Sequence, residues 1–209
     1  MKKLTPLSEM LKNGLRLLSA AAVIGVLSAT AGQAAPATKP AEANLVANGS
    51  LETPNATGDY AVAWNKAKGG KTSWLAEEGD HFIRLEATEA NKMTTLYNQV
   101  PLQGAAAVEL TVKVRVTGLI RGAQSWFDAR VMTKFCDVNG VEIKGGAKNI
   151  AFGKNTEGWV EKKVVMTVPA GATFIAIMPT LLNVEAGTMD LTEIKLLAVE
   201  PPAPAAPTP

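Results

Sequence analysis

Residues 108–116 read Val-Glu-Leu-Thr-Val-Lys-Val-Arg-Val, and this run decides the fold class. Apolar and polar side chains alternate along it, which is typical of a β-strand with one buried and one solvated face. Residues 126–135 alternate in the same way. We therefore expect the core to contain Val112, Val114, Val131 and Phe135, and the intervening side chains to face water.

Short strands fill most of the remaining chain. They are predicted at residues 72–76, 81–86, 94–100, 141–143, 159–168, 173–178 and 191–199. Residues 137–140 end in Asn-Gly, a strong signal for a hairpin turn. No convincing helix of ten residues follows the N-terminal segment. The sequence predicts an all-β fold, a two-sheet antiparallel jelly-roll sandwich.

The two ends of the chain differ from its middle. Residues 1–34 combine a basic start, an uncharged apolar run at 17–31 and small residues, as in a secretory signal peptide. The apolar run is short for a membrane span, which needs about 20 residues. Residues 35–43 form a Pro/Ala linker, 44–199 the β-sandwich and 200–209 a Pro/Ala-rich disordered tail. We expect an exported protein, periplasmic or extracellular, with no membrane span after signal removal.

Charge argues against nucleic acid as a partner. Residues 1–34 hold four of the 21 basic residues but only one of the 19 acidic ones, so the remainder is close to neutral. Nucleic-acid binding needs a basic surface. Cys136 is the single cysteine, so no intramolecular disulfide can form. We expect Cys136 to be a small buried residue of its strand.

Residues 44–52 read Asn-Leu-Val-Ala-Asn-Gly-Ser-Leu-Glu and are predicted to form a first strand that bends at Asn-Gly. The stretch resembles the Asn-Leu-x-x-Asn-Gly-x-Phe-Glu opening of carbohydrate-binding modules with a galactose-binding-like β-sandwich, with Leu51 in place of Phe. Similar small motifs follow in the family order at 79–85, 96–102, 135–140, 158–159 and 194–196. The resemblance covers residues 44–198 and indicates the glycoside-hydrolase-associated, cellulose- or xylan-binding, CenC-like type.

The resemblance implies a non-catalytic module that binds a polysaccharide or cell-envelope glycan. Many members also hold a structural calcium with the acidic residues of a closing Asp-Asp-Val/Ile motif and the Glu of the first motif. Here the closing motif reads Thr192-Glu193-Ile194. Calcium needs six to eight oxygen ligands, and only Glu52 and Asp190 are candidates. We therefore predict no cofactor and no confident metal site.

Aromatic and planar polar side chains are the groups that sugar recognition needs. Trp126, Asp128 and Arg130 are predicted to point to one side of a strand, with Tyr97, Gln99 and Trp74 extending that surface if their strands are neighbours. A surface Asp–Arg pair worth ~0–1 kcal/mol is the alternative reading of Asp128 and Arg130. Two other tryptophans match family positions that pack at strand starts, and are predicted to be structural: Trp64 and Trp159.

Catalytic signatures are missing from the sequence. His81 is the only histidine and is predicted to be a plain turn or strand residue. The chain has no Gly-x-Ser-x-Gly elbow, no His/Cys cluster for zinc and no phosphate loop. We expect no enzyme activity. The alternative function is a structural or protein-interaction β-sandwich that does not bind sugar.

Overall fold

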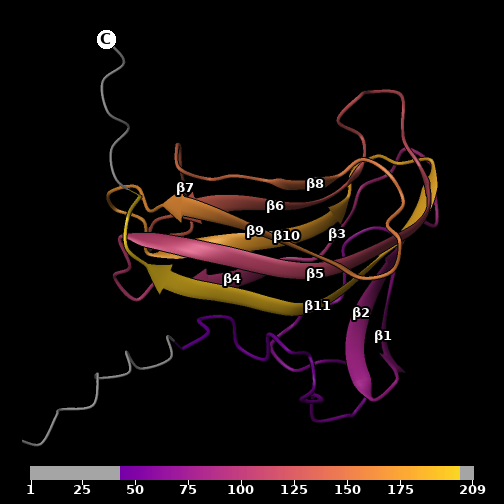
Figure 1. Cartoon of the computed structure of the whole chain (residues 1–209), viewed down its shortest axis with the longest axis horizontal. Helices are drawn as coiled ribbons and strands as arrows, with labels where there is room; N and C mark the ends of the chain where they lie inside the picture. Colours follow the sequence, from indigo (N-terminus) through magenta and orange to yellow (C-terminus); the bar gives the residue numbers. More distant parts are fainter. Residues whose placement is uncertain (1–42, 203–209) are drawn as a thin grey trace, which may run out of the picture. The chain divides into compact units, whose positions relative to one another are not determined.

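The computed structural model describes residues 43–202, and these form two antiparallel sheets with no helix (Figure 1). The predicted signal peptide, nearly all of the linker and the end of the tail lie outside the described residues. None of the described residues belongs to a helix long and apolar enough to cross a membrane.

The first sheet has five strands. Their spatial order is β1 (Lys71–Glu77), β2 (Asp80–Glu86), β11 (Ala186–Val199), β5 (Ala107–Ile120) and β9 (Val160–Thr167). All four neighbouring pairs are antiparallel. The longest strand pair is β5 with β11, which are fourteen residues each and pair over most of their length.

The second sheet is built around two long strands. β10 (Phe174–Leu181) pairs along its length with β6 (Ala129–Cys136). Short strands line their outer edges: β3 (Thr94–Thr95) and β4 (Asn98–Pro101) pair with β10, and β7 (Glu142–Ile143) and β8 (Ile150–Phe152) pair with β6. The jelly-roll type of two-sheet sandwich predicted from the sequence is confirmed.

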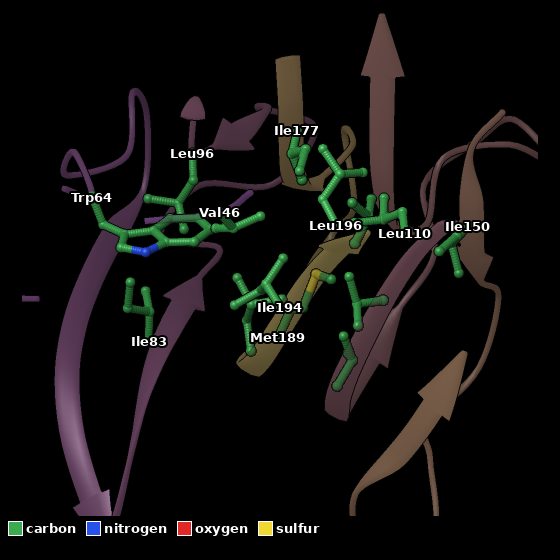
Figure 2. Close-up of a cluster of buried hydrophobic side chains, with 14 of the residues drawn as sticks. Val46, Trp64, Ile83, Leu96, Leu110, Ile150, Ile177, Met189, Ile194 and Leu196 are labelled. Carbon is green, nitrogen blue, oxygen red and sulfur yellow. The ribbon is translucent and has the colours of Figure 1, made fainter. Parts of the chain in front are cut away.

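The core lies between the two sheets. Val112, Val114, Val131 and Phe135 are all fully buried, as the alternation predicts. Figure 2 shows side chains from both sheets meeting there, with Ile83 and Leu110 from the first sheet and Ile177 from the second. Burying such side chains is worth about 1.5–3 kcal/mol each.

Trp64 and Cys136 have the structural roles predicted for them. Trp64 lies in the core beside Val46 (Figure 2), and its Nε1 donates to the carbonyl of Asn48 at 3.1 Å. Cys136 is fully buried at the end of β6.

Residues 44–52 do not form the predicted strand. They make a series of turns, with positive φ at Asn48 and Leu51. Two main-chain bonds join the segment to β11, from the Leu45 amide to the Leu196 carbonyl and from the Ile194 amide to the Gly49 carbonyl. The Asn44 side chain adds two more: its Oδ1 accepts from the Leu196 amide at 2.8 Å and its Nδ2 donates to the Ile194 carbonyl at 3.0 Å. Asparagine competes with regular strand pairing in this way because its amide imitates a peptide group.

Other predicted boundaries also differ. The strand expected at 94–100 is broken into β3 and β4, and β11 begins five residues before Leu191. β6 begins at Ala129, so residues 126–128 precede the strand. β8 was not predicted, because three residues are too few to display a period.

Lysines close the opening where the edges of the two sheets meet. Lys162 of β9 donates through Nζ to the carbonyl of Ala151 in β8 at 2.8 Å. In return, Lys148 donates through Nζ to the carbonyl of Val165 in β9 at 2.9 Å. The Lys162 ammonium also lies 4.5 Å from the ring centroid of Phe152. Strand β9 and the loop before β8 thus each supply a lysine that donates to a main-chain carbonyl of the opposite edge.

Candidate functional site

The outer faces of the two sheets differ in chemistry. Along the outside of the first sheet, cations and carboxylates are paired: Lys71–Glu86, Arg84–Asp190, Lys113–Glu193, Arg115–Glu77 and Lys163–Glu109. A surface on which charges are already matched offers few unpaired groups to a ligand.

Asp190 is the centre of the first face. Its side chain is only 1% exposed. Arg84 donates to its two oxygens, from Nε at 2.6 Å and from Nη2 at 2.8 Å. Arg115 donates from Nε at 3.0 Å and also reaches Glu77 at 2.8 Å. The hydrogen bond to Asp190 is the main cause of a raised pKa of Arg84.

Two aromatic rings belong to the same network. The guanidinium of Arg115 lies 4.6 Å from the ring centroid of Trp159, a cation–π distance. Phe82 meets Trp159 edge to face, with centroids 5.6 Å apart. Trp159 is therefore held by its neighbours, as its predicted structural role requires.

The candidate calcium ligands are engaged elsewhere. Both oxygens of Asp190 accept hydrogen bonds from arginines. Glu52 accepts from the His81 amide at 2.8 Å and contacts His81 Nδ1 at 2.7 Å. The pKa of Glu52 is lowered, chiefly by the bond from the His81 backbone. Within residues 43–202 no three His, Cys, Asp or Glu side chains are grouped as a metal ion would require.

Trp74 lies on the first sheet, away from the other predicted ligand-binding residues. It is half-buried in β1, and its Nε1 donates to the Leu51 carbonyl at 3.0 Å. Its ring stacks on the imidazole of His81, with centroids 4.3 Å apart. Trp74 was predicted to extend the surface of Trp126, Asp128 and Arg130 if their strands were neighbours, but β1 and β6 belong to different sheets.

The outer face of the second sheet carries fewer charged side chains. The pairing register places Gln99 of β4, Ala176 of β10 and Lys134 of β6 in one row. The next outward-facing pair along the strands is Met178 and Met132, both half-buried.

Tyr97 stands beside this row. It is 37% exposed and precedes β4. The Lys134 ammonium lies 5.8 Å from the centroid of its ring. Tyr97 and Gln99 therefore lie on one face with Lys134 of β6, although β4 and β6 are not neighbours and β10 lies between them.

Trp126 and Arg130 meet at one end of β6. Trp126 is 55% exposed on the loop between β5 and β6. Arg130 donates through Nη2 to the Trp126 carbonyl at 2.6 Å. Arg130 itself is largely covered, with a side-chain exposure of 14%. The exposed group at this end is therefore the indole.

Asp128 does not face the solvent as predicted. Only 5% of the residue is exposed, and its Oδ1 accepts from Arg130 Nε at 2.6 Å. The prediction extended strand alternation to residues that belong to a loop, which is closed by bonds from Gly122 to Phe127 and from Phe127 to Gln124. Asp128 and Arg130 form an ion pair, the alternative that the sequence left open, but a largely buried one.

The sequence does not reveal two neighbour relations on this face, Met132 with Met178 and Lys134 with Tyr97. Alternation points Met132 and Lys134 outward, but their neighbours are 46 and 37 residues away in the chain. Only the pairing of β6 with β10, and of β10 with β4, brings them together. The resulting arrangement has an aromatic ring at each end, methionines between them and one ammonium group.

Similarity to known proteins is found among solved structures. No family model and no curated protein matches the chain. Among solved structures it is similar to the enzymatically active domain of bacteriophage CBA120 tailspike protein 4, with a TM-score of 0.57 and 12% identity over 75% of this chain and 21% of that one. An arabinose-bound α-L-arabinofuranosidase, MgGH51, gives a TM-score of 0.51 and 11% identity over 75% of this chain and 26% of that one.

Several of the matched structures are carbohydrate-binding modules. The CBM22-1 xylan-binding domain from Paenibacillus barcinonensis Xyn10C is covered over 100% of its length and 79% of this chain, with 17% identity and a TM-score of 0.47. This chain spans 21% and 26% of the first two structures, which are much longer. The likeness to the first two structures, whose TM-scores exceed 0.5, supports the two-sheet all-β fold.

Proposed function

We propose that this chain is a non-catalytic carbohydrate-binding module that binds a polysaccharide or cell-envelope glycan on the outer face of the second sheet. The observation that carries the proposal is the contrast between the two outer faces. One is covered by ion pairs, whereas the other exposes Tyr97 and Trp126 around an apolar floor.

Sugar rings need both kinds of group that this face presents. The C–H side of a pyranose packs on a flat aromatic ring, and its hydroxyls need planar donors and acceptors. Tyr97 supplies the ring, and Gln99, exposed in the neighbouring strand, supplies an amide. Trp126 supplies a second ring on the β5–β6 loop. A shallow face leaves much of a ligand in water, so we expect a Kd of ~10–1000 μM.

Alanine variants of the two aromatic residues test the proposal. Tyr97→Ala and Trp126→Ala should each weaken binding to a glycan identified on an array by about tenfold, equivalent to ~1.4 kcal/mol. Both rings are partly exposed, so the melting temperature should change little. Isothermal titration calorimetry and thermal melting of the same samples measure the two effects.

Leu75→Ala is the matched control, because Leu75 is an exposed apolar residue on the other sheet. It should bind like the wild type. Wild-type affinity in both aromatic variants would place any binding elsewhere on the molecule. An array without any bound glycan would favour the structural or protein-interaction function instead.

Export is part of the proposal and rests on residues 1–34 alone. A module of this kind would meet its glycan in the periplasm or outside the cell. N-terminal sequencing of the exported protein is the measurement, with a start between Gly32 and Pro36 expected. A start at Met1 would contradict the signal peptide.

A further inference from the structure

Lys134 differs from the other cations of the outer face of the second sheet. Arg130 is paired with Asp128, and Lys144 of the adjoining segment is paired with Glu142 at 2.8 Å. Lys134 makes no ion pair with any carboxylate of residues 43–202. Its long side chain is half-buried and brings its ammonium over the ring of Tyr97.

Glu142 does not neutralise this lysine. It lies one strand away on β7, opposite Cys136, and its carboxylate is bonded to Lys144. Its pKa is lowered, mainly by that bond, and Lys134 is the smallest of the causes. The positive charge of Lys134 therefore remains without a matched negative group, beside an aromatic ring and close to two methionines.

The cations on the outer face of the first sheet are in the reverse situation, since five of them, among them Arg84 and Arg115, are each paired with a carboxylate. An anionic ligand would thus find an unpaired ammonium group, that of Lys134, on the face that also exposes Tyr97 and Trp126. Charge-assisted hydrogen bonds to carboxylates are the strongest that an ammonium makes.

We propose that the glycan bound by this face is acidic, a polysaccharide that carries uronic acid carboxylates. This inference rests on the proposed function and adds the chemical class of the sugar. The Lys134 ammonium lies over the Tyr97 ring, 5.8 Å from its centroid, so a uronic acid ring would pack on the exposed remainder of Tyr97 with its carboxylate beside that ammonium. Gln99 lies in the same row as Lys134, beyond the small side chain of Ala176, and can bond the hydroxyls of the same chain of sugars.

The test uses the full chain and pairs of matched glycans. Galacturonan, glucuronoxylan and alginate are each offered intact and after chemical reduction of their carboxyl groups to neutral alcohols, which keeps the linkages and removes the charge. At least one intact glycan should bind tenfold or more tightly than its reduced form, and added salt should weaken this preference. Affinity electrophoresis and calorimetry provide the measurements.

Substitutions of Lys134 assign the preference to a residue. Lys134→Met keeps the apolar stem over Tyr97 and should abolish the preference for the intact glycan, whereas Lys134→Arg should retain it. Lys154→Gln is the control, because Lys154 is exposed on the β8–β9 loop and makes no ion pair within residues 43–202. The Lys154→Gln variant should prefer the intact over the reduced glycan to the same degree as the wild type.

The outcomes separate this inference from the proposed function. If the chain binds reduced or neutral glycans as tightly as acidic ones, or if Lys134→Met keeps the preference, the acidic class is wrong and carbohydrate binding stands. If neither acidic nor neutral glycans bind, both fail.

Discussion

Asp190→Asn should destabilise the domain by about 3 kcal/mol, the lower end of the cost of removing one partner from a buried ion pair. The substitution keeps the shape of the side chain and removes its charge. Two arginines then face an uncharged amide, whose NH2 group cannot accept their hydrogen bonds. Arg84 and Arg115 are 35% and 21% exposed, so both can turn partly toward water, which keeps the loss near the lower end.

Urea unfolding measures this loss as a shift of the midpoint at constant slope. In thermal melting, 3 kcal/mol corresponds to roughly 6–12 °C for a domain of this size. Glu86→Gln is the control, because the Lys71–Glu86 pair is exposed on the same sheet, with N and O 3.6 Å apart. It should cost at most ~1 kcal/mol. An Asp190→Asn loss no larger than that of the control would refute the view that Asp190 holds the outer face of the first sheet together.

Two further predictions concern the N-terminal segment of the domain. Gly49→Ala should lower the free energy of unfolding by about 1–3 kcal/mol, since an added Cβ would lie 2.1 Å from the Ile194 carbonyl oxygen. Gly153→Ala is the control, because its added Cβ would meet no atom within 4 Å, and it should change the free energy of unfolding in urea by less than ~0.5 kcal/mol. Equal effects of the two substitutions would contradict the close approach of Gly49 to Ile194. Glu52 has a pKa lowered from its ordinary value of 4.5, so its charge stabilises the fold above that pH and the contribution is lost as the pH falls through the lowered value. The difference in melting temperature between wild type and Glu52→Gln should therefore shrink with acidification, and a constant difference would show that the contact with His81 carries no charge dependence.

The fold could be predicted where one side of a strand is buried along its whole length. Residues 108–116 are such a case, because each apolar side chain from Val108 to Val116 is fully buried between the sheets. The pattern failed at residues 44–52, where turns interrupt the pairing with β11 and an asparagine side chain supplies two of the bonds. It also failed at Asp128, one residue before β6 begins, where a loop rather than a strand sets the direction of the side chain.

The candidate site could be predicted only in part, because its members come from distant parts of the chain. Tyr97 and Gln99 could be placed on one side of their segment from period two alone. Their proximity to Lys134 depends on β10 lying between β4 and β6, which no local pattern encodes. The bond between Arg84 and Asp190 spans 106 residues for the same reason. Local alternation orients a side chain, whereas the order of strands decides which side chains meet.

Lys162 and Lys148, which bridge the edges of the two sheets, affect whether another copy of the chain can add a strand there. An edge strand with unbonded carbonyls is a template on which another chain can add a strand, and such growth leads to insoluble assemblies. Here an incoming strand would find the carbonyls of Ala151 and Val165 already occupied by Lys162 and Lys148. It would also meet the two positive charges of these lysines, and a second copy of the chain would bring the same two charges close to them. The sandwich thus keeps an open edge without offering it for polymerisation.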